Sequence, residues 1–185
     1  MRTSFRLAAV TLVIAVGLSL GGCAPDAPAP KPTASPSATP LFATDEEALA
    51  AAEEAYAAYL RVSDTITAEG GADIERIDAV VASSLKEALH DSLSKYKDRG
   101  LHTVGNSKFD TSSVQRIEND ADGPMSIGLY LCLDVQGVRV ISKDGTDVTP
   151  IDRVDRLPLV IDLISDDAGG LVMESSESWT GANFC

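Results

Sequence analysis

The chain has 185 residues, of which 28 are Asp or Glu and 15 are Lys or Arg, so its formal net charge is −13. With 44% hydrophobic residues it is too apolar for a disordered acidic tail, and its length fits one ordinary domain. Binding to a phosphate backbone needs clustered Lys and Arg, so the charge balance argues against nucleic acid as a partner.

An apolar segment near the N-terminus has the features of an export signal. Arg2 and Arg6 precede residues 7–20, a stretch of 14 residues without a charge. A membrane span needs about 20 apolar residues, so this stretch is short for a permanent anchor. We interpret residues 1–22 as a signal peptide; the alternative is an anchor helix that is retained.

Leu20-Gly21-Gly22-Cys23 follows this stretch and resembles the bacterial lipobox, in which two small residues separate an aliphatic residue from a cysteine. The resemblance implies cleavage after Gly22 and a lipidated Cys23 with acyl chains such as palmitate, a combination that anchors a protein stably. The domain is then expected on the outer face of the cytoplasmic membrane. Ordinary secretion is the alternative, but it would leave the thiol of Cys23 exposed in an oxidising compartment.

Residues 23–43 are expected to form a disordered tether. Six of the nine prolines lie between Pro25 and Pro40, with Ala, Ser and Thr between them, so no core can form there. In polyproline geometry such a tether reaches up to about 60 Å. Beyond residue 44 the chain has 12 basic and 27 acidic residues, so an anionic membrane should repel the domain and the lipid must hold it there.

The domain, residues 44–185, is predicted to begin with three helices. Thr44-Asp45-Glu46-Glu47 fits a capping box, apolar residues then recur at helical spacing, and Gly70-Gly71 ends the helix. Asp73 is expected to cap a short second helix. Ser84-Leu85-Lys86-Glu87 is a second capping-box pattern, and the third helix should end at Gly100.

After about residue 102 the apolar period changes from 3.6 to 2, which predicts strands. Residues 125–135 alternate most regularly, and further strands are expected at 138–142, 157–164 and 171–179, with a less regular pair at 103–108 and 112–118. Helices followed by antiparallel strands indicate the α+β class.

The order of elements resembles the NTF2-like α+β cone, in which N-terminal helices pack on a curved antiparallel sheet. The strand Leu129-Tyr130-Leu131-Cys132-Leu133-Asp134 and the tail from Ser178 to Cys185 also resemble actinobacterial lipoproteins of unknown function. The NTF2-like resemblance implies a cone that encloses a ligand, hosts isomerase or dehydratase chemistry, or serves only for interaction. The fold alone does not choose among these functions.

With Cys23 lipidated, Cys132 and Cys185 remain. Because export places them in an oxidising compartment, we expect a structural disulfide between them. A redox pair and two free thiols are the alternatives, although Cys-x-x-Cys spacing is absent.

The sequence contains few patterns that indicate catalysis, a cofactor or a metal site. The sequence has no Gly-x-Ser-x-Gly, P-loop or Gly-x-Gly-x-x-Gly pattern, and we predict no cofactor. His90 and His102 are too few for a zinc site, and Asp120-Ala121-Asp122-Gly123 lacks the later ligands of a calcium loop.

A pocket inside the cone would be lined by aromatic and acidic residues. Its candidates are Tyr56, Tyr59, Tyr130, Asp134, Asp162 and Trp179. For the two helical tyrosines and for Trp179 the competing interpretation is core packing, and for the two aspartates an exposed face or sheet rim. If Asp134 or Asp162 faced the interior, it would be a candidate general base.

Two functions are therefore expected. The first is a lipid-anchored, non-enzymatic binding or interaction module, whose partner is an envelope protein or a small apolar ligand. The alternative is a small-molecule isomerase or lyase that uses a carboxylate inside the cone.

Overall fold

The computed structural model describes residues 42–119 and 123–185. The expected signal peptide, Cys23, the tether up to residue 41 and residues 120–122 of the acidic motif lie outside this part of the chain. Within it, no helix combines the length and the apolarity that crossing a bilayer requires.

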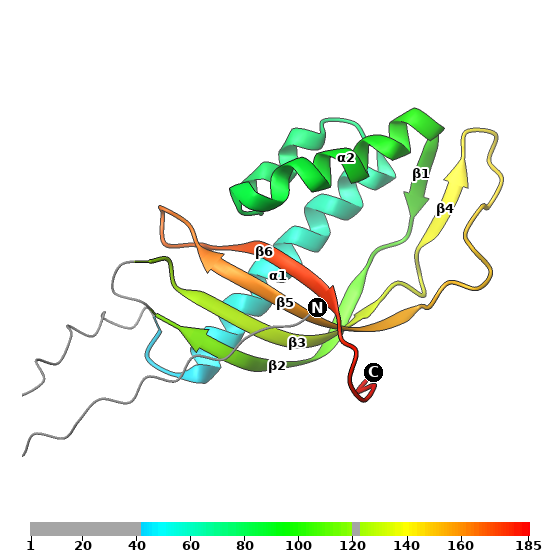
Figure 1. The fold of residues 1–185 in the computed structure, drawn as a ribbon. Helices are drawn as coiled ribbons and strands as arrows, with labels where there is room; N and C mark the ends of the chain where they lie inside the picture. The colour runs from blue at the N-terminus through cyan, green and yellow to red at the C-terminus, as the bar shows by residue number, and fades with distance from the viewer. Residues whose placement is uncertain (1–41, 120–122) are drawn as a thin grey trace, which may run out of the picture. The chain divides into compact units, whose positions relative to one another are not determined.

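The described residues form an α+β fold (Figure 1). Its elements are α1 (Asp45–Ala68), the 3-10 helix η1 (Ile74–Ala79), α2 (Ser83–Arg99), β1 (Leu101–Val104), β2 (Lys108–Glu118), β3 (Ser126–Asp134), β4 (Arg139–Ser142), β5 (Arg156–Ser165) and β6 (Leu171–Ser178). Four strands form an antiparallel sheet in the order β2-β3-β5-β6, while β1 and β4 pair as a separate arm. The predicted fold class, α+β with N-terminal helices packed on a curved antiparallel sheet, is confirmed.

The core lies between α1 and one face of the four-stranded sheet, which we call the inner face. From α1 it contains Ala48, Ala52, Tyr56, Leu60 and Ile66, and from the strands Ile127, Leu129, Leu131, Ile161, Leu163 and Met173. The small alanines let the helix approach the sheet closely. Because strand side chains alternate, every second residue of β3 and β5 enters this core and the residues between them face outward.

The helix boundaries follow the sequence in part. The hydroxyl of Thr44 accepts the N–H of Glu47 at 3.2 Å and the Glu47 carboxylate accepts the N–H of Ala43 at 2.9 Å, so the first cap is confirmed. The predicted cap at Asp73 is wrong, because that residue has φ 47° and an N-cap side chain needs an extended backbone. The capping box at Ser84 is also wrong: α2 begins at Ser83 after Ala82, whose N–H is bound by Met173 O at 2.7 Å.

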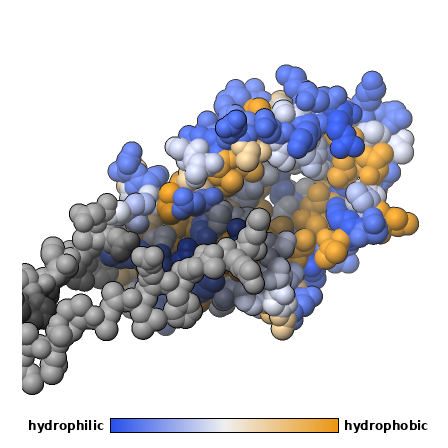
Figure 2. Space-filling view, viewed as in Figure 1, coloured by the Kyte–Doolittle hydropathy of each residue, from blue (hydrophilic) through white to orange (hydrophobic). Residues whose placement is uncertain are grey.

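The strand pairing differs from the prediction at the arm and at the C-terminal end. The expected early pair does not form, because β1 pairs with β4 and β2 pairs with β3. β6 ends at Ser178, so Trp179 follows the strand instead of belonging to it. In Figure 2, hydrophilic side chains cover the region of α2, and hydrophobic ones gather where Figure 1 places β1, β4 and the following loop.

Candidate functional site

The predicted interior pocket does not form, because the sheet separates its residues. Tyr56 and Tyr59 belong to α1, on the inner side. Tyr130 and Asp134 alternate with Leu129, Leu131 and Leu133 along β3, and Asp162 lies between two buried residues of β5. These three side chains therefore point to the opposite, outer face. Trp179 joins them there through its contact with Tyr130.

Tyr56 is a core residue. Its side chain is 1% exposed, lies edge-on to Phe109 at a centroid distance of 5.0 Å and packs against Tyr59 at 5.9 Å. Burial raises the pKa of Tyr56, and burial also raises the pKa of Tyr59, with the charge of Asp64 adding to both shifts. Both hydroxyls therefore stay protonated, and the core interpretation holds for Tyr56.

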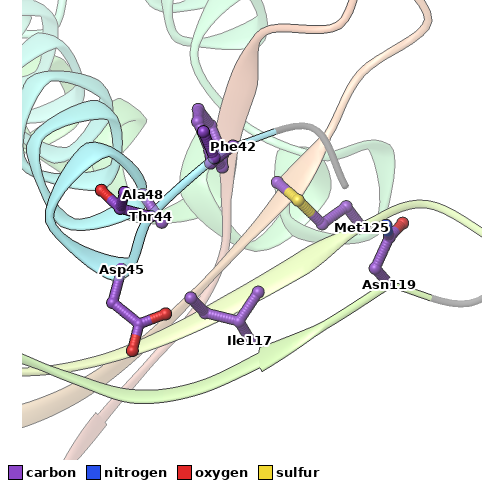
Figure 3. Close-up of a pocket in the computed structure, with 8 residues that line it drawn as sticks. Phe42, Thr44, Asp45, Ala48, Ile117, Asn119 and Met125 are labelled. Carbon is purple, nitrogen blue, oxygen red and sulfur yellow. The ribbon is translucent and has the colours of Figure 1, made fainter. Parts of the chain in front are cut away.

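A cavity of about 180 Å³ lies at the start of α1 (Figure 3). Phe42 precedes the helix, Ile117 comes from the end of β2, and Met125 immediately precedes β3. Met125 is 5% exposed and belongs to the core. This cavity marks the end of the hydrophobic core where the chain enters the domain.

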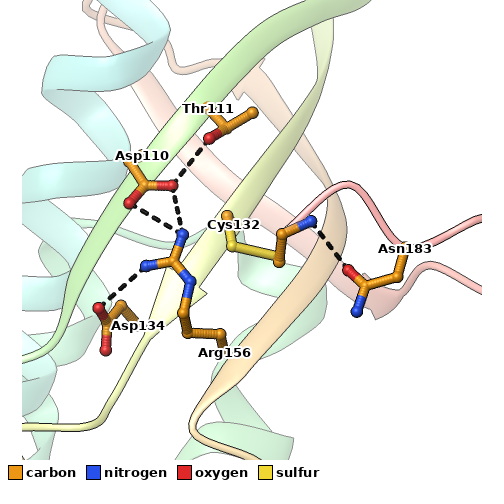
Figure 4. Close-up of a disulfide and its surroundings, with 7 residues drawn as sticks. Asp110, Thr111, Cys132, Asp134, Arg156 and Asn183 are labelled. Carbon is orange, nitrogen blue, oxygen red and sulfur yellow. Dashed lines mark hydrogen bonds and ion pairs between the residues drawn. A yellow bond between two sulfur atoms is a disulfide. The ribbon is translucent and has the colours of Figure 1, made fainter.

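The carboxylate of Asp134 is held in an ion pair on the outer face (Figure 4). Arg156 from β5 places one nitrogen 3.0 Å from Asp134 and another 2.8 Å from Asp110, so it links three strands. Its hydrogen bonds, with one from Thr111, hold the pKa of Asp110 below its usual range. Asp134 is thus a structural partner of Arg156 and not a carboxylate inside the cone.

Asp162 is part of a second polar cluster on the outer face. Arg116 lies 3.0 Å from one carboxylate oxygen and the hydroxyl of Ser175 donates to the other at 2.8 Å. Gly128 leaves room for this cluster: a Cβ there would lie 3.2 Å from Asp162 and 2.7 Å from Gln115. The interior placement on which the general-base hypothesis depended is therefore wrong for both aspartates.

Between these two clusters the C-terminal segment crosses the outer face. The sulfurs of Cys132 and Cys185 are bonded, with their Cα atoms 5.5 Å apart, as expected from the sequence. The N–H of Trp179 donates to Pro158 O at 2.8 Å, and the indole N–H donates to Ala182 O at 3.1 Å. The segment after β6 is thus fixed at both of its ends.

This segment and the edge strand β2 enclose a groove of about 450 Å³, which we call the outer groove. It is lined by Thr111, Ser113, Tyr130, Trp179, Ala182 and Phe184. Tyr130 is its base, with Trp179 at 5.2 Å and Phe184 at 6.0 Å, both edge-on. Three aromatic rings around one opening make a surface suited to apolar or aromatic ligands.

Irregular backbone in β2 shapes the polar wall of the outer groove. The register shifts between Asp110 and Ser113 and again between Val114 and Arg116, so two bulges interrupt the strand. Thr111 has φ 54°, which is rare for a β-branched residue. The second bulge brings Gln115 onto the outer face, where its amide donates to the hydroxyl of Tyr130 at 3.2 Å. Strained backbone of this kind often marks a functional site.

Sequence reasoning found Tyr130 and Trp179 but missed the other members of the outer groove. Phe184 precedes Cys185 in the sequence, so a disulfide from Cys185 to Cys132 implies that the ring of Phe184 lies near β3. The alternation of β3 also indicated that Tyr130, Cys132 and Asp134 share one face opposite the leucines. No sequence signal marked the bulges, because they depend on how β2 pairs with β3.

The described residues contain no group of three His, Cys, Asp or Glu side chains that could hold a metal ion. His90 lies 2.8 Å from Asp78, so it pairs with the 3-10 helix, and His102 belongs to β1.

No model of a known protein family matches the chain, and no curated protein matches it. Among solved structures, the intermembrane space region of the chloroplast protein ARC6 matches at a TM-score of 0.53 and 12% identity, over 72% of this chain and 97% of that one. A periplasmic fragment of TraM gives 0.48 and 12% over 76% and 100%, and Aln2 from a Streptomyces species gives 0.45 and 18% over 73% and 91%. The similarity to the ARC6 region supports the fold and nothing further.

Proposed function

We propose that this protein is a lipid-anchored, extracytoplasmic binding module that takes a small, mostly apolar ligand in the outer groove. The observation that carries the proposal is the outer groove itself, with three aromatic rings around an opening of about 450 Å³. Volumes of this order are common for small-molecule sites, which are lined mainly by apolar and aromatic side chains.

The polar groups at the groove favour an apolar ligand, because most of them already have partners. The indole N–H of Trp179 is bound by Ala182 O, the hydroxyl of Thr111 donates to Asp110 at 2.8 Å, and that of Tyr130 accepts from Gln115. The hydroxyl of Ser113 and the proton of Tyr130 remain to orient a ligand. Recognition therefore depends on ring faces more than on hydrogen bonds.

The compartment in the proposal rests on the sequence. The lipobox-like Leu20-Gly21-Gly22-Cys23 supports lipidation of Cys23 and export. The bonded pair Cys132 and Cys185 fits an oxidising compartment, where structural disulfides persist. The proposed function remains that of a binding module, but its ligand site is the outer groove on the outer face of the sheet and not a pocket inside the cone.

Trp179 is the single tryptophan, so its fluorescence reports on the outer groove directly. The probe is N-phenyl-1-naphthylamine, a neutral apolar fluorophore that accepts energy from tryptophan. It is added to the full-length protein in nonionic detergent, with Trp179→Phe as background for probe dissolved in the micelles. We expect saturable energy transfer.

Two matched variants locate the binding. Phe184→Ala removes a ring from the outer groove and should weaken probe binding at least tenfold. Phe42→Ala removes a ring from the cavity at the start of α1 and should leave binding unchanged. Transfer that does not saturate, or that depends on Phe42 and not on Phe184, would contradict the proposal.

A further inference from the structure

Apolar side chains are exposed together on the loop after β4, on the arm that projects from the main sheet. Val148 is 44% exposed, Val154 is 63% exposed and Ile151 is fully exposed. Polar residues and Gly are usual at turns, so an isoleucine at such a position is exceptional. The turn is ordered: the N–H of Arg153 donates to Pro150 O at 3.2 Å, with Ile151 between them.

The loop is held in place by its own polar contacts. The guanidinium of Arg153 donates to Asp155 at 2.7 Å and to Val135 O at 2.9 Å, and the N–H of Val148 donates to Val140 O at 2.8 Å. Ile151 is therefore presented by a fixed backbone and does not need to be ordered on binding, which lowers the entropic cost of docking.

A groove of about 320 Å³ runs beside this loop, and we call it the arm groove. Its lining includes Lys95, Tyr96, Arg99, Leu101, Val140 and Val148. Lys95 and Arg99 lie one helical turn apart on α2, and neither forms an ion pair in the described part of the chain. Acidic residues exceed basic ones by more than two to one in this domain. Two cations beside an apolar groove that have no acidic partner among the described residues are therefore unusual, and they are available to bind carboxylates of another molecule.

We propose that the arm groove and Ile151 dock an acidic, amphipathic segment of an extracytoplasmic partner protein. Carboxylates of the segment pair with Lys95 and Arg99, while its aliphatic side chains pack on Val148 and Ile151. This surface is distinct from the outer groove, and the proposal does not depend on a ligand there. Burial of Ile151 supplies affinity, and the two cations supply orientation and selectivity.

An anionic membrane is the competing occupant, since exposed aliphatic residues and cations also suit lipid surfaces. The loop itself argues against it, because it carries Asp144, Asp147, Asp152 and Asp155. Hydrogen bonds from Ser142 and Thr146 lower the pKa of Asp144, and those from Thr149 lower that of Asp147, so both stay charged. An extended anionic surface that buried Ile151 would face these loop carboxylates and be repelled by them. None of the four lines the arm groove, so a narrow segment lying there can pair its own carboxylates with Lys95 and Arg99.

The test uses three fluorescein-labelled synthetic peptides and the full-length protein in nonionic detergent, with empty micelles as background. One peptide combines Glu with Leu, the second replaces Glu by Lys, and the third replaces Leu by Ser. Fluorescence anisotropy should show binding of the Glu–Leu peptide only. The double variant Lys95→Glu with Arg99→Glu, and separately Ile151→Asp, should each weaken binding at least tenfold.

Lys108→Glu is the matched control, because Lys108 is a cation on β2 that lies away from the arm groove and forms no ion pair with the residues that the structure describes. Lys108→Glu should leave the affinity for the Glu–Leu peptide unchanged. Energy transfer from Trp179 to N-phenyl-1-naphthylamine should be the same in all variants. The proposal is overturned if the Glu–Leu peptide does not bind, if the Lys peptide binds as well, or if charge reversal at Lys95 and Arg99 has no effect. It is equally overturned if that reversal abolishes co-sedimentation with anionic vesicles while peptide binding persists.

Discussion

Trp179 lies edge-on to Tyr130, with ring centroids 5.2 Å apart and ring planes at 76°. Tyr130 is fixed within β3, whereas Trp179 belongs to the segment that the bond between Cys132 and Cys185 holds on the sheet. The ring contact and the covalent bond therefore stabilise the same wall of the outer groove. We therefore expect the shape of the outer groove to depend on whether Cys132 and Cys185 are bonded.

Cys185→Ser should destabilise the domain and weaken ligand binding together. The bridge closes a separation of 53 residues, for which loop entropy gives about 4 kcal/mol of stabilisation. Urea denaturation followed by circular dichroism should show a loss of this order, with probe transfer from Trp179 reduced in the folded variant. Wild-type protein treated with a reductant is the control and should behave like the variant; full probe binding in both would count against the coupling.

Thr111→Gly should raise the stability of the folded protein while weakening binding in the outer groove. Glycine adopts φ 54° without the steric cost that threonine bears, about 1 kcal/mol or more. Thermal melts and the probe titration measure the two effects separately. The substitution also removes the hydrogen bond from the Thr111 hydroxyl to Asp110, so a variant destabilised by more than that bond, about 1 kcal/mol, would contradict strain at Thr111.

Tyr56→Ala should cost about 3–5 kcal/mol in the free energy of unfolding, because it leaves a cavity beside Phe109 in a fully packed region. Tyr59→Ala is the comparison: its ring is only partly buried, so the loss should be clearly smaller. Chemical denaturation of both variants checks this order. Equal losses would mean that Tyr56 is not the principal aromatic residue of the core.

Asp110 should contribute to sensitivity to acid. Its pKa is lower in the folded chain than the ordinary 3.8, so its stabilising effect is present above that value and is lost as the pH falls through the folded pKa. Asp110→Asn should therefore flatten the fall in stability below about pH 4. Urea midpoints between pH 5 and pH 2 measure this, and Arg156→Gln should flatten the curve in the same way. An unchanged slope in both variants would exclude the ion pair as its source.

Cys23→Ser should release the protein from salt-washed membranes or mislocalise it, since two acyl chains are expected to hold it there. Mass spectrometry of the mature wild-type N-terminus should show a lipidated cysteine at position 23. Cys132→Ser is the matched control, because it removes a cysteine without affecting the anchor. Retention of the Cys23 variant in washed membranes would contradict lipid anchoring.

The sequence predicted those parts of the fold that depend on local pattern. The apolar period of α1, the cap at Thr44 and the alternation along β3 are each determined by neighbours within one element. Pairing between distant segments was not predictable in this way. Ala82, and not Ser84, precedes α2 because its N–H is bound by Met173, some ninety residues later.

The sequence predicted some of the residues of the candidate site but not their location in the fold. Tyr130 and Trp179 were recognised as ring residues, and the disulfide was inferred from compartment and cysteine number. Tyr130, Trp179 and the disulfide lie on the outer face because α1 packs on the opposite face of the sheet. Which face α1 covers depends on tertiary packing and not on a local sequence pattern. Arg116 and Arg156 were not anticipated, because each pairs with an aspartate on a neighbouring strand of the folded sheet.

The pairing of Asp134 with Arg156 has a consequence for how the protein can vary. The two residues pair directly with each other, Asp134 at the end of β3 and Arg156 at the start of β5. The chain between them, residues 135–155, therefore leaves the four-stranded sheet and returns to it at the same pair of residues. Insertions or deletions in that excursion would not shift the register of the strands on either side. The segment between them, which contains β4 and the loop that carries Ile151, can therefore diverge in length while the four-stranded sheet stays the same.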